Sequence, residues 1–153
     1  MTIATSADQR WMTRALELAR DAEREGDVPV GALVVCGDRC IAQAENRTVR
    51  HQDPTAHAEI LAIREAAAVQ KSWRLNGCAL YVTLEPCAMC AGAIVLARLD
   101  RLVFGAWDDK AGMVGSVGDL VRHPKLNHRP EVLGGVLAVE SGQLLSGFFK
   151  DRR

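Results

Sequence analysis

Hydrophobic and polar positions in the first third of the chain follow two different patterns. Over residues 8–25, apolar side chains recur every three or four positions with charged ones opposite, which predicts an amphipathic helix. The β-rich runs 28–35 and 40–45 flank the turn residues Gly37 and Asp38. This second pattern predicts a β-hairpin after the helix.

The middle of the chain contains the start signals of two more helices. Asp53 followed by Pro54 is typical of a helix N-terminus, and the alanine-rich run to residue 70 continues it. Residues 80–84 are almost entirely apolar, as in a short strand that is covered on both faces. A second helix is then predicted over 87–99.

The last third continues the alternation of strands and helices. We predict a short strand over 102–104, a long connection over 107–130, a strand within 131–139 and a C-terminal helix over 140–150. Strands that alternate with helices indicate an α/β protein whose sheet carries helices on both faces. The hairpin makes this predicted sheet mixed.

Composition and charge limit the class of protein. The chain has 153 residues, 48% of them hydrophobic, and its 19 basic side chains balance 19 acidic ones. This size suits one domain over residues 1–153, and the neutral balance excludes a generally polycationic nucleic-acid coat. No apolar stretch approaches the ~18 residues of a membrane span, and no signal peptide is apparent, so we expect a cytoplasmic protein without a membrane partner.

The candidate chemistry lies in two short motifs. Cys87 and Cys90 are three positions apart at the predicted start of a helix, directly after Pro86. A helix N-terminus favours thiolates, and together with His57 these residues form a ligand set of one nitrogen and two sulfurs that suits zinc. A redox pair is the alternative for an isolated C-x-x-C motif, but the combination with His57 favours a metal.

Three protein ligands indicate a catalytic zinc ion, because structural zinc is normally closed by four. Glu59, two positions after His57, can then act as general acid and base beside a zinc-activated water molecule. Cys78 would close the site as a fourth ligand, but its position at the start of a buried strand favours a packed thiol. The odd total of five cysteines favours reduced thiols, and we interpret Cys36 and Cys40 as ordinary strand residues.

The motif H-A-E followed by P-C-x-x-C resembles the signature of zinc-dependent nucleobase deaminases. Almost the whole chain is similar to the bacterial tRNA-specific adenosine deaminases, within the cytidine/deoxycytidylate deaminase superfamily. The segments that carry this resemblance are 28–32, 46–47, 53–59, 80–93, 103–106, 108–110, 127–129 and 148–153.

The resemblance implies a three-layer cytidine-deaminase-like fold with a five-stranded mixed sheet. The implied reaction is hydrolytic deamination of adenosine to inosine at the wobble position of a tRNA anticodon. One Zn²⁺ per subunit would be bound by His57, Cys87 and Cys90, and Glu59 would carry protons while the activated water attacks adenine C6. The implied partners are the tRNA anticodon stem-loop and a second copy of the chain in a homodimer.

The resemblance also assigns residues that bind the substrate. Its substrate-binding positions are Val28, Asn46, Ala58, Pro86 and Asp108. The positions expected to contact the RNA are Arg47, Lys110, Asn127, His128, Arg129, Phe149, Arg152 and Arg153. Trp107 stands at a position that varies in the family, and both stacking on a base and packing against a second subunit are open for it.

Two alternatives remain open at this point. A small-molecule deaminase of the same fold, acting on guanine or cytosine, would use the same zinc chemistry. A zinc-stabilised nucleic-acid-binding module without catalysis would need Cys78 as a fourth ligand. No nucleotide cofactor is expected, because Gly112, Gly115 and Gly118 do not follow the strand-turn-helix pattern of a phosphate-binding loop.

Overall fold

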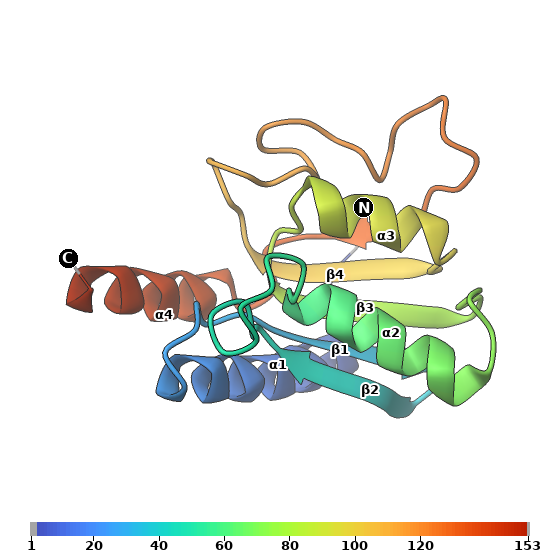
Figure 1. The fold of residues 1–153 in the computed structure, drawn as a ribbon. Helices are drawn as coiled ribbons and strands as arrows, with labels where there is room; N and C mark the ends of the chain where they lie inside the picture. Colours follow the sequence, from blue (N-terminus) through green and yellow to red (C-terminus); the bar gives the residue numbers. More distant parts are fainter. Residues whose placement is uncertain (1–2, 153) are drawn as a thin grey trace.

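A five-stranded mixed sheet forms the centre of the molecule in the computed structural model, which describes residues 3–152 (Figure 1). Its strands are β1 (Gly31–Cys36), β2 (Arg39–Glu45), β3 (Cys78–Leu84), β4 (Arg101–Ala106) and β5 (Glu131–Leu133). They lie in the order β2-β1-β3-β4-β5. Strand β1 is antiparallel to β2 and β3, whereas β3, β4 and β5 are parallel, so the predicted mixed sheet is confirmed.

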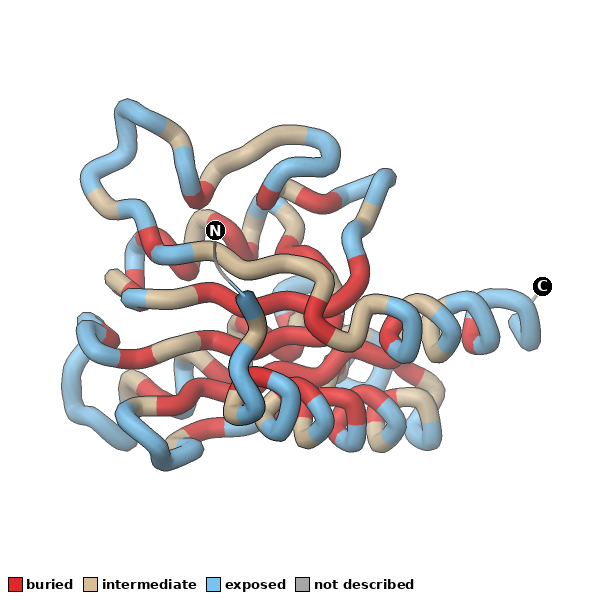
Figure 2. The backbone as a smooth tube through the Cα atoms, turned by 180° about the vertical axis from the view of Figure 1, so that it is seen from behind, coloured by how far each residue is buried: buried red, intermediate tan, exposed pale blue. Residues whose placement is uncertain are grey.

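Two helices cover each face of this sheet. Helices α2 (Ala58–Gln70) and α3 (Ala88–Leu96) pack on one face, and α1 (Ser6–Arg24) and α4 (Ala138–Asp151) pack on the other. Figure 2 shows that buried residues follow the central strands and the helix sides that meet them. The predicted three-layer α/β fold is therefore confirmed. Among the helices of residues 3–152, none has the length and apolar character needed to cross a membrane.

The first helix illustrates how local sequence and packing specify these layers. The Thr5 hydroxyl accepts a hydrogen bond from the Asp8 backbone N–H, and the Asp8 carboxylate accepts one from the Thr5 N–H, which forms a capping box. The same buried carboxylate accepts a hydrogen bond from the Tyr81 hydroxyl at 2.7 Å and thereby ties α1 to β3. A Cβ at Gly31 would lie 2.1 Å from the Ala15 carbonyl oxygen, so glycine permits the close approach of α1 and β1.

One edge of the sheet gathers the ends of several elements. Strands β3 and β4 are parallel and end at this edge, while the antiparallel strand β1 begins there and β2 ends there. The amino ends of α2 and α3 lie at the same edge (Figure 1). The connections 28–30, 46–57, 85–87 and 107–118 therefore meet, in the region where open α/β sheets bind ligands.

Two predicted strands are shorter in the structure. Strand β1 begins at Gly31 rather than at residue 28, because the Val30 N–H donates to the Val28 carbonyl at 2.8 Å in a tight turn. Strand β5 contains only Glu131–Leu133, because the chain leaves the sheet at Gly134 and Gly135 before α4. The strand predicted within 131–139 is therefore confirmed, but it contains only the first three of these residues.

The helix start predicted at Asp53 is also wrong. Asp53 Oδ1 accepts hydrogen bonds from the backbone N–H of Thr55 at 2.8 Å and from its hydroxyl at 2.7 Å, which closes a side-chain turn. Helix α2 begins at Ala58, and His57 is its N-cap residue with an extended backbone (φ −73°, ψ 148°). The Asp-Pro pair thus starts the turn before the helix, and this shift decides where the His57 side chain points.

The cysteine assignment is wrong at two positions. Cys36 and Cys78 are direct cross-strand partners in β1 and β3, and their sulfur atoms form a disulfide. Cys78 is therefore not a packed thiol, and Cys36 is not an ordinary strand residue. The other three cysteines, Cys40, Cys87 and Cys90, are free thiols.

Candidate active site

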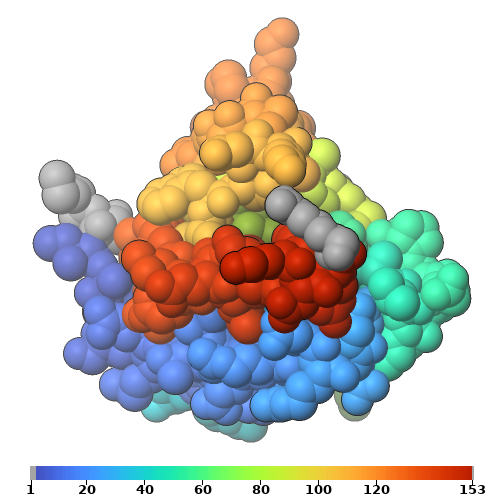
Figure 3. Space-filling view, turned by 90° about the vertical axis from the view of Figure 1, so that its left-hand side faces the viewer, coloured from blue at the N-terminus to red at the C-terminus, as the bar shows by residue number. Residues whose placement is uncertain are grey.

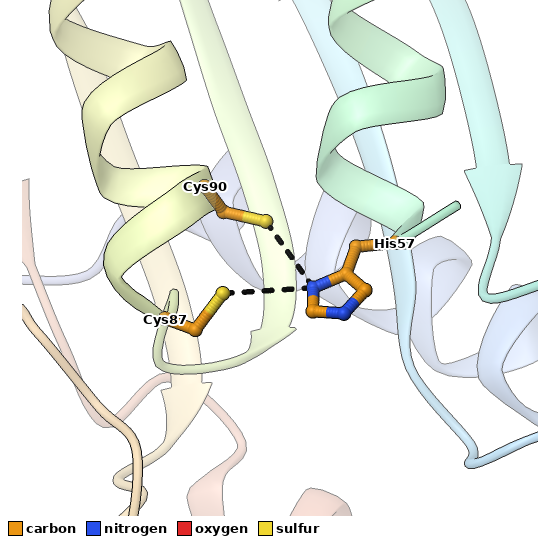
Figure 4. Close-up of side chains that lie close together, drawn as sticks. All are labelled: His57, Cys87 and Cys90. Atoms are coloured by element: carbon orange, nitrogen blue, oxygen red, sulfur yellow. Dashed lines mark hydrogen bonds between the residues drawn. The ribbon is translucent and has the colours of Figure 1, made fainter. Parts of the chain in front are cut away.

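Three metal-binding side chains converge where α2 and α3 begin (Figure 4). His57 is the N-cap residue of α2, Cys87 is the N-cap residue of α3, and Cys90 lies in the first turn of α3. The Nδ1 atom of His57 lies 3.6 Å from Sγ of Cys87 and 3.5 Å from Sγ of Cys90. Because the two N-cap residues have extended backbones, their side chains leave the helix axes and meet between the helices.

These separations fit a zinc ion. Zn–S bonds of about 2.3 Å and Zn–N bonds of about 2.0 Å at a tetrahedral angle place nitrogen and sulfur about 3.5 Å apart. Within residues 3–152, His57, Cys87 and Cys90 are the cluster of side chains that can hold a metal ion. Cys78 is bonded to Cys36 at the opposite end of β3, so the alternative in which Cys78 closes the site is wrong.

Among the three side chains, Cys87 is the one whose charge favours a cation. Hydrogen bonds from Cys90 and His57 lower the pKa of Cys87 to about 3, against the effect of burial. The neighbouring Cys87 sulfur in turn raises the pKa of Cys90 and that of His57. The N-termini of α2 and α3 add positive potential that stabilises thiolate. Electron-rich sulfur and an imidazole at this spacing are ligands that zinc prefers.

Glu59 lies in the first turn of α2, beside the metal cluster, and its side chain is buried. Burial raises the pKa of Glu59 to about 7, although the backbone N–H of Glu59 and the charge of His57 act in the opposite direction. A carboxyl group that titrates near neutral pH can both accept and release a proton. The position therefore suits the proton carrier that the sequence predicts.

A cavity of about 360 Å³ opens over the cluster. His57, Glu59 and Cys87 form part of its wall. Of the five substrate-binding positions expected from the sequence, four also line this cavity: Val28, Asn46, Ala58 and Asp108. Pro86 does not line it; its carbonyl oxygen accepts a hydrogen bond from the Met113 N–H at 2.9 Å.

Asn46 follows β2 directly and presents its amide to the cavity. Its Nδ2 donates to the Val28 carbonyl at 3.3 Å, and its Oδ1 accepts from the Thr48 hydroxyl at 2.6 Å. These two bonds fix the orientation of the amide, and among residues 3–152 the second Nδ2 hydrogen has no acceptor. A fixed amide in the wall of a cavity is suited to recognise the edge of a nucleobase.

Glu85 is a residue of the site that sequence reasoning missed. One carboxylate oxygen accepts from the Asp108 N–H at 2.9 Å, and the other accepts from the N–H groups of Val114 at 2.9 Å and Ser116 at 3.1 Å. The Ser116 hydroxyl also donates to this carboxylate. Its position just before Pro86 places Glu85 next to the metal-binding motif in the sequence. The N–H groups that its carboxylate accepts from, however, lie 23–31 positions further along the chain.

Asp27 is the second missed residue. Its carboxylate is fully buried and accepts hydrogen bonds from the N–H groups of Val49 at 2.6 Å and Arg50 at 3.4 Å. It thereby holds the connection after β2 against the cavity, which Asp27 and Val49 both line. No short-range signal in the sequence pointed to this role.

The predicted RNA contacts fall into two groups. Lys110, Phe149 and Arg152 line a second cavity that adjoins the first. Arg47 lies at the end of β2, where its Nε pairs with the Glu45 carboxylate at 3.0 Å.

Asn127, His128 and Arg129 lie away from the metal cluster. His128 Nε2 forms a hydrogen bond with the Leu99 carbonyl oxygen at 2.7 Å, next to the start of β4 and thus at the opposite edge of the sheet. Arg129 donates to the Pro124 carbonyl at 3.1 Å, and Asn127 belongs to the same loop. Arg153 is outside the described residues.

Fold and site together define a class of enzyme, because the H-x-E and P-C-x-x-C motifs of zinc-dependent nucleobase deaminases meet in one cavity. The MafB19-like deaminase family model matches residues 6–153. The tRNA-specific adenosine deaminase of Bacillus subtilis (strain 168) is 47% identical over 95% of this chain and 91% of its own length. The chain belongs to the MafB19-like deaminases and, within them, to the family of the tRNA-specific adenosine deaminases.

Solved structures support this assignment. One, from a study of A-to-I editing by tRNA:A34 deaminases at the wobble position, matches with a TM-score of 0.86 and 46% identity, covering 89% of this chain and 99% of that chain. Guanine deaminase from Nitrosomonas europaea matches with a TM-score of 0.77 and 28% identity, covering 97% of this chain and 86% of that chain.

Proposed function

We propose that the protein hydrolyses the adenosine at the wobble position of a tRNA anticodon to inosine and releases ammonia. The observation that carries this proposal is the cluster of His57, Cys87 and Cys90 beside the buried carboxyl of Glu59 in one cavity. The similarity to relatives that carry this activity over nearly the whole chain supports the choice of substrate.

His57, Cys87 and Cys90 would hold one zinc ion per subunit. When bound there, zinc would act as a Lewis acid that lowers the pKa of water in contact with it toward neutrality. Glu59 would accept one proton from the attacking water and deliver it to the purine ring nitrogen, and would then accept the remaining proton of the new hydroxyl and deliver it to the departing amine. The reaction consumes adenosine and water and yields inosine and ammonia, so Glu59 ends each cycle in the state in which it began.

The rest of the cavity orients the base. The free Nδ2 hydrogen of Asn46 is placed to donate to an acceptor on the purine edge, and Val28 and Ala58 provide apolar contact with the ring faces. Asp108, which the Glu85 carboxylate holds through its N–H, closes the cavity on the side of the 107–118 connection. A base must leave the anticodon stack to enter this cavity, as in other enzymes that act on nucleobases.

The bound tRNA would extend beyond the cavity and contact the surface around it. The proposal also includes that the protein acts in the cytoplasm as a homodimer. Lys110, Phe149 and Arg152 lie beside the cavity within one subunit. Asn127, His128 and Arg129 lie at the opposite edge of the sheet, so they would approach the same anticodon loop from a second subunit. Sedimentation of the protein with and without the stem-loop tests this arrangement.

The test is to measure inosine in an anticodon stem-loop after incubation with zinc-loaded protein, by mass spectrometry of the nucleosides. We expect Glu59→Gln to lower the rate by roughly 10²–10⁴-fold, the range for general acid–base groups, while the zinc content stays unchanged. Glu65→Gln on the exposed side of α2 is the matched control and should leave the rate unchanged. Loss of zinc together with activity in Glu59→Gln would contradict the assigned role.

The same assay separates the proposal from a small-molecule deaminase. The structural similarity to a guanine deaminase makes free guanine the first competitor, and free cytosine the second. We expect ammonia release with the stem-loop and none with free guanine or cytosine. Ammonia from guanine without inosine in the RNA would replace the proposed substrate and leave the metal site as described.

A further inference from the structure

A second cavity of about 660 Å³ adjoins the one over the metal cluster. The two cavities share Val28, Leu84 and Asp108 in their walls, so they lie next to each other. Figure 3 looks onto this face, where α4 (red) crosses beneath the amber residues that follow β4, with the teal 46–56 connection beside them. Whatever part of a substrate leaves the first cavity on this side enters the second.

Trp107 forms a fixed aromatic wall of the second cavity. Its ring meets the Phe104 ring edge to face, with centroids 5.7 Å apart. It also lies so close to Gly135 that a Cβ there would be 2.5 Å from the indole. These contacts hold the ring in place, yet 54% of Trp107 is exposed. An indole that is held on one side and open on the other is a surface for stacking.

Aromatic and cationic groups of α4 also line this cavity. Phe149 is 49% exposed and lines the cavity, and Arg152 carries its guanidinium 3.7 Å from the centroid of the Phe148 ring. Lys110 adds a second cation to the lining. Two acidic residues, Asp108 and Asp109, also line the cavity. Asp108 Oδ1 already accepts hydrogen bonds from the backbone N–H groups of Lys110 and Ala111.

We propose that Trp107 stacks on the base of the nucleotide next to the target adenosine, and that the second cavity is the binding site of this neighbouring nucleotide. The inference rests on the proposed function, because a base inside an RNA chain cannot enter the first cavity without carrying its neighbours to the mouth. Unstacked bases of single-stranded RNA bind to aromatic side chains, and cations bind the intervening phosphate. Lys110 and Arg152 supply these cations.

The occupant is RNA rather than a second copy of the chain, because the site continues the catalytic cavity. A subunit seated on Trp107 would close the path along which the anticodon backbone must leave the first cavity. Stacking is tolerant of sequence, since every base presents a π face. Trp107 therefore contributes to affinity for the neighbouring nucleotide without demanding one base.

The test compares Trp107→Ala and Trp107→Phe on stem-loops that carry either a normal or an abasic nucleotide next to the target, on the 5′ side or on the 3′ side. We expect Trp107→Ala to lower kcat/KM on the normal RNA by roughly 5- to 150-fold, the range for one base–aromatic stack, and Trp107→Phe to keep most of the activity. On one of the two abasic RNAs, Trp107→Ala should have almost no further effect.

This comparison does not depend on the stability of the variant, because each variant is measured on all RNAs. An equal loss for Trp107→Ala on the normal and on both abasic RNAs would overturn the proposal. A smaller molecular mass of Trp107→Ala in sedimentation would overturn it as well, because Trp107 would then be a subunit contact. Absence of inosine with wild-type protein on every RNA is a separate result, which contradicts the proposed function instead.

A spectroscopic measurement gives a readout other than activity. Trp11→Phe and Trp73→Phe leave Trp107 as the one tryptophan of the chain, and Glu59→Gln prevents conversion of the RNA. Stacking predicts that the normal stem-loop quenches the Trp107 emission and that one of the abasic stem-loops does not. Equal quenching by all three RNAs would contradict a stack on the neighbouring base.

Discussion

Replacement of Glu85 by glutamine tests how the wall of the active site is held. The Glu85 carboxylate is 2% exposed and accepts three backbone hydrogen bonds, from Asp108, Val114 and Ser116, in addition to the Ser116 hydroxyl. Glutamine has the same shape but only one accepting oxygen, because its NH₂ group can only donate. If the NH₂ group of Glu85→Gln takes the place of Oε2, the N–H groups of Val114 and Ser116 both lose their acceptor. If it takes the place of Oε1, the Asp108 N–H loses its acceptor, while the Ser116 hydroxyl can turn and accept from the NH₂ group.

The size of the effect follows from this count. A hydrogen bond to a charged group contributes about 1.5–3 kcal/mol, so the loss of one or two amounts to about 1.5–6 kcal/mol if the connection stays in place. The connection lies at the surface and can open to water, which limits the observed loss in the free energy of unfolding to about 1.5–4 kcal/mol. Because the connection that carries Asp108 then loses part of its anchor, kcat/KM should fall along with stability.

The pH dependence of the difference has a definite sign. Burial by itself would raise the pKa of Glu85, but the hydrogen bonds from Ser116, Asp108 and Val114 outweigh it and hold the pKa below the ordinary 4.5. A carboxylate with a lowered pKa in the folded state stabilises the protein above its unfolded pKa, and this contribution is lost as the pH falls through the folded value. The gap in stability between wild type and Glu85→Gln should therefore be full at pH 7 and shrink below about pH 4.5.

The assay is urea unfolding of both proteins across this pH range, together with kcat/KM on the stem-loop at pH 7. Glu65→Gln, an exposed position of α2, is the matched control and should change stability by less than about 0.5 kcal/mol. A loss below about 1 kcal/mol in Glu85→Gln, or a gap that persists unchanged at low pH, would refute the reasoning, since either result means that the charge of the carboxylate is not what holds the connection.

Two further predictions concern the disulfide and the glycines. Under denaturing, metal-free conditions without reductant, an alkylating reagent should label three of the five cysteines, and all five after reduction; five labels without reductant would show that Cys36 and Cys78 are not bridged. Gly105→Ala should cost about 1–3 kcal/mol of stability and reduce activity, because its Cβ would lie 2.5 Å from the Thr83 carbonyl oxygen. Gly92→Ala, which has open space around the new Cβ, should instead stabilise α3 by about 0.5–1 kcal/mol. Circular dichroism melts measure both changes in stability, and the two variants should shift the melting temperature in opposite directions.

The features that the sequence predicted correctly depend on short-range patterns. The amphipathic helix, the hairpin and the strand before the P-C-x-x-C motif all follow from residues close to one another in the chain. Cys87 and Cys90 lie in one turn of a helix, and His57 and Glu59 are two positions apart, so each motif was visible as a unit. What the sequence alone did not show was that both motifs face one cavity, although the resemblance to deaminases implied it.

The features that it did not predict depend on pairings across long distances. Cys36 and Cys78 are 42 positions apart and meet because β1 and β3 are neighbours in register. Asp53 is followed by Pro54 as at a helix start, but its side chain accepts hydrogen bonds from the hydroxyl and N–H of Thr55. These bonds form a turn, and the helix begins only at Ala58. Glu85 accepts from donors up to 31 positions away, so its role appears only once the connection has folded back.

The late start of α2 resolves a difficulty that the spacing of His57 and Glu59 poses. Two positions apart on an α-helix, the side chains would point about 200° apart and could not serve one site. His57 lies instead at the N-cap with an extended backbone, so its imidazole turns out of the helix toward Cys87, while Glu59 stays in the first turn and lines the same cavity. The turn at Asp53 makes this arrangement possible, because it ends the connection before α2 and leaves His57 at the N-cap. Asp53, whose pattern predicted the wrong helix start, is therefore part of the reason that the metal ligand His57 and the proton carrier Glu59 line one cavity.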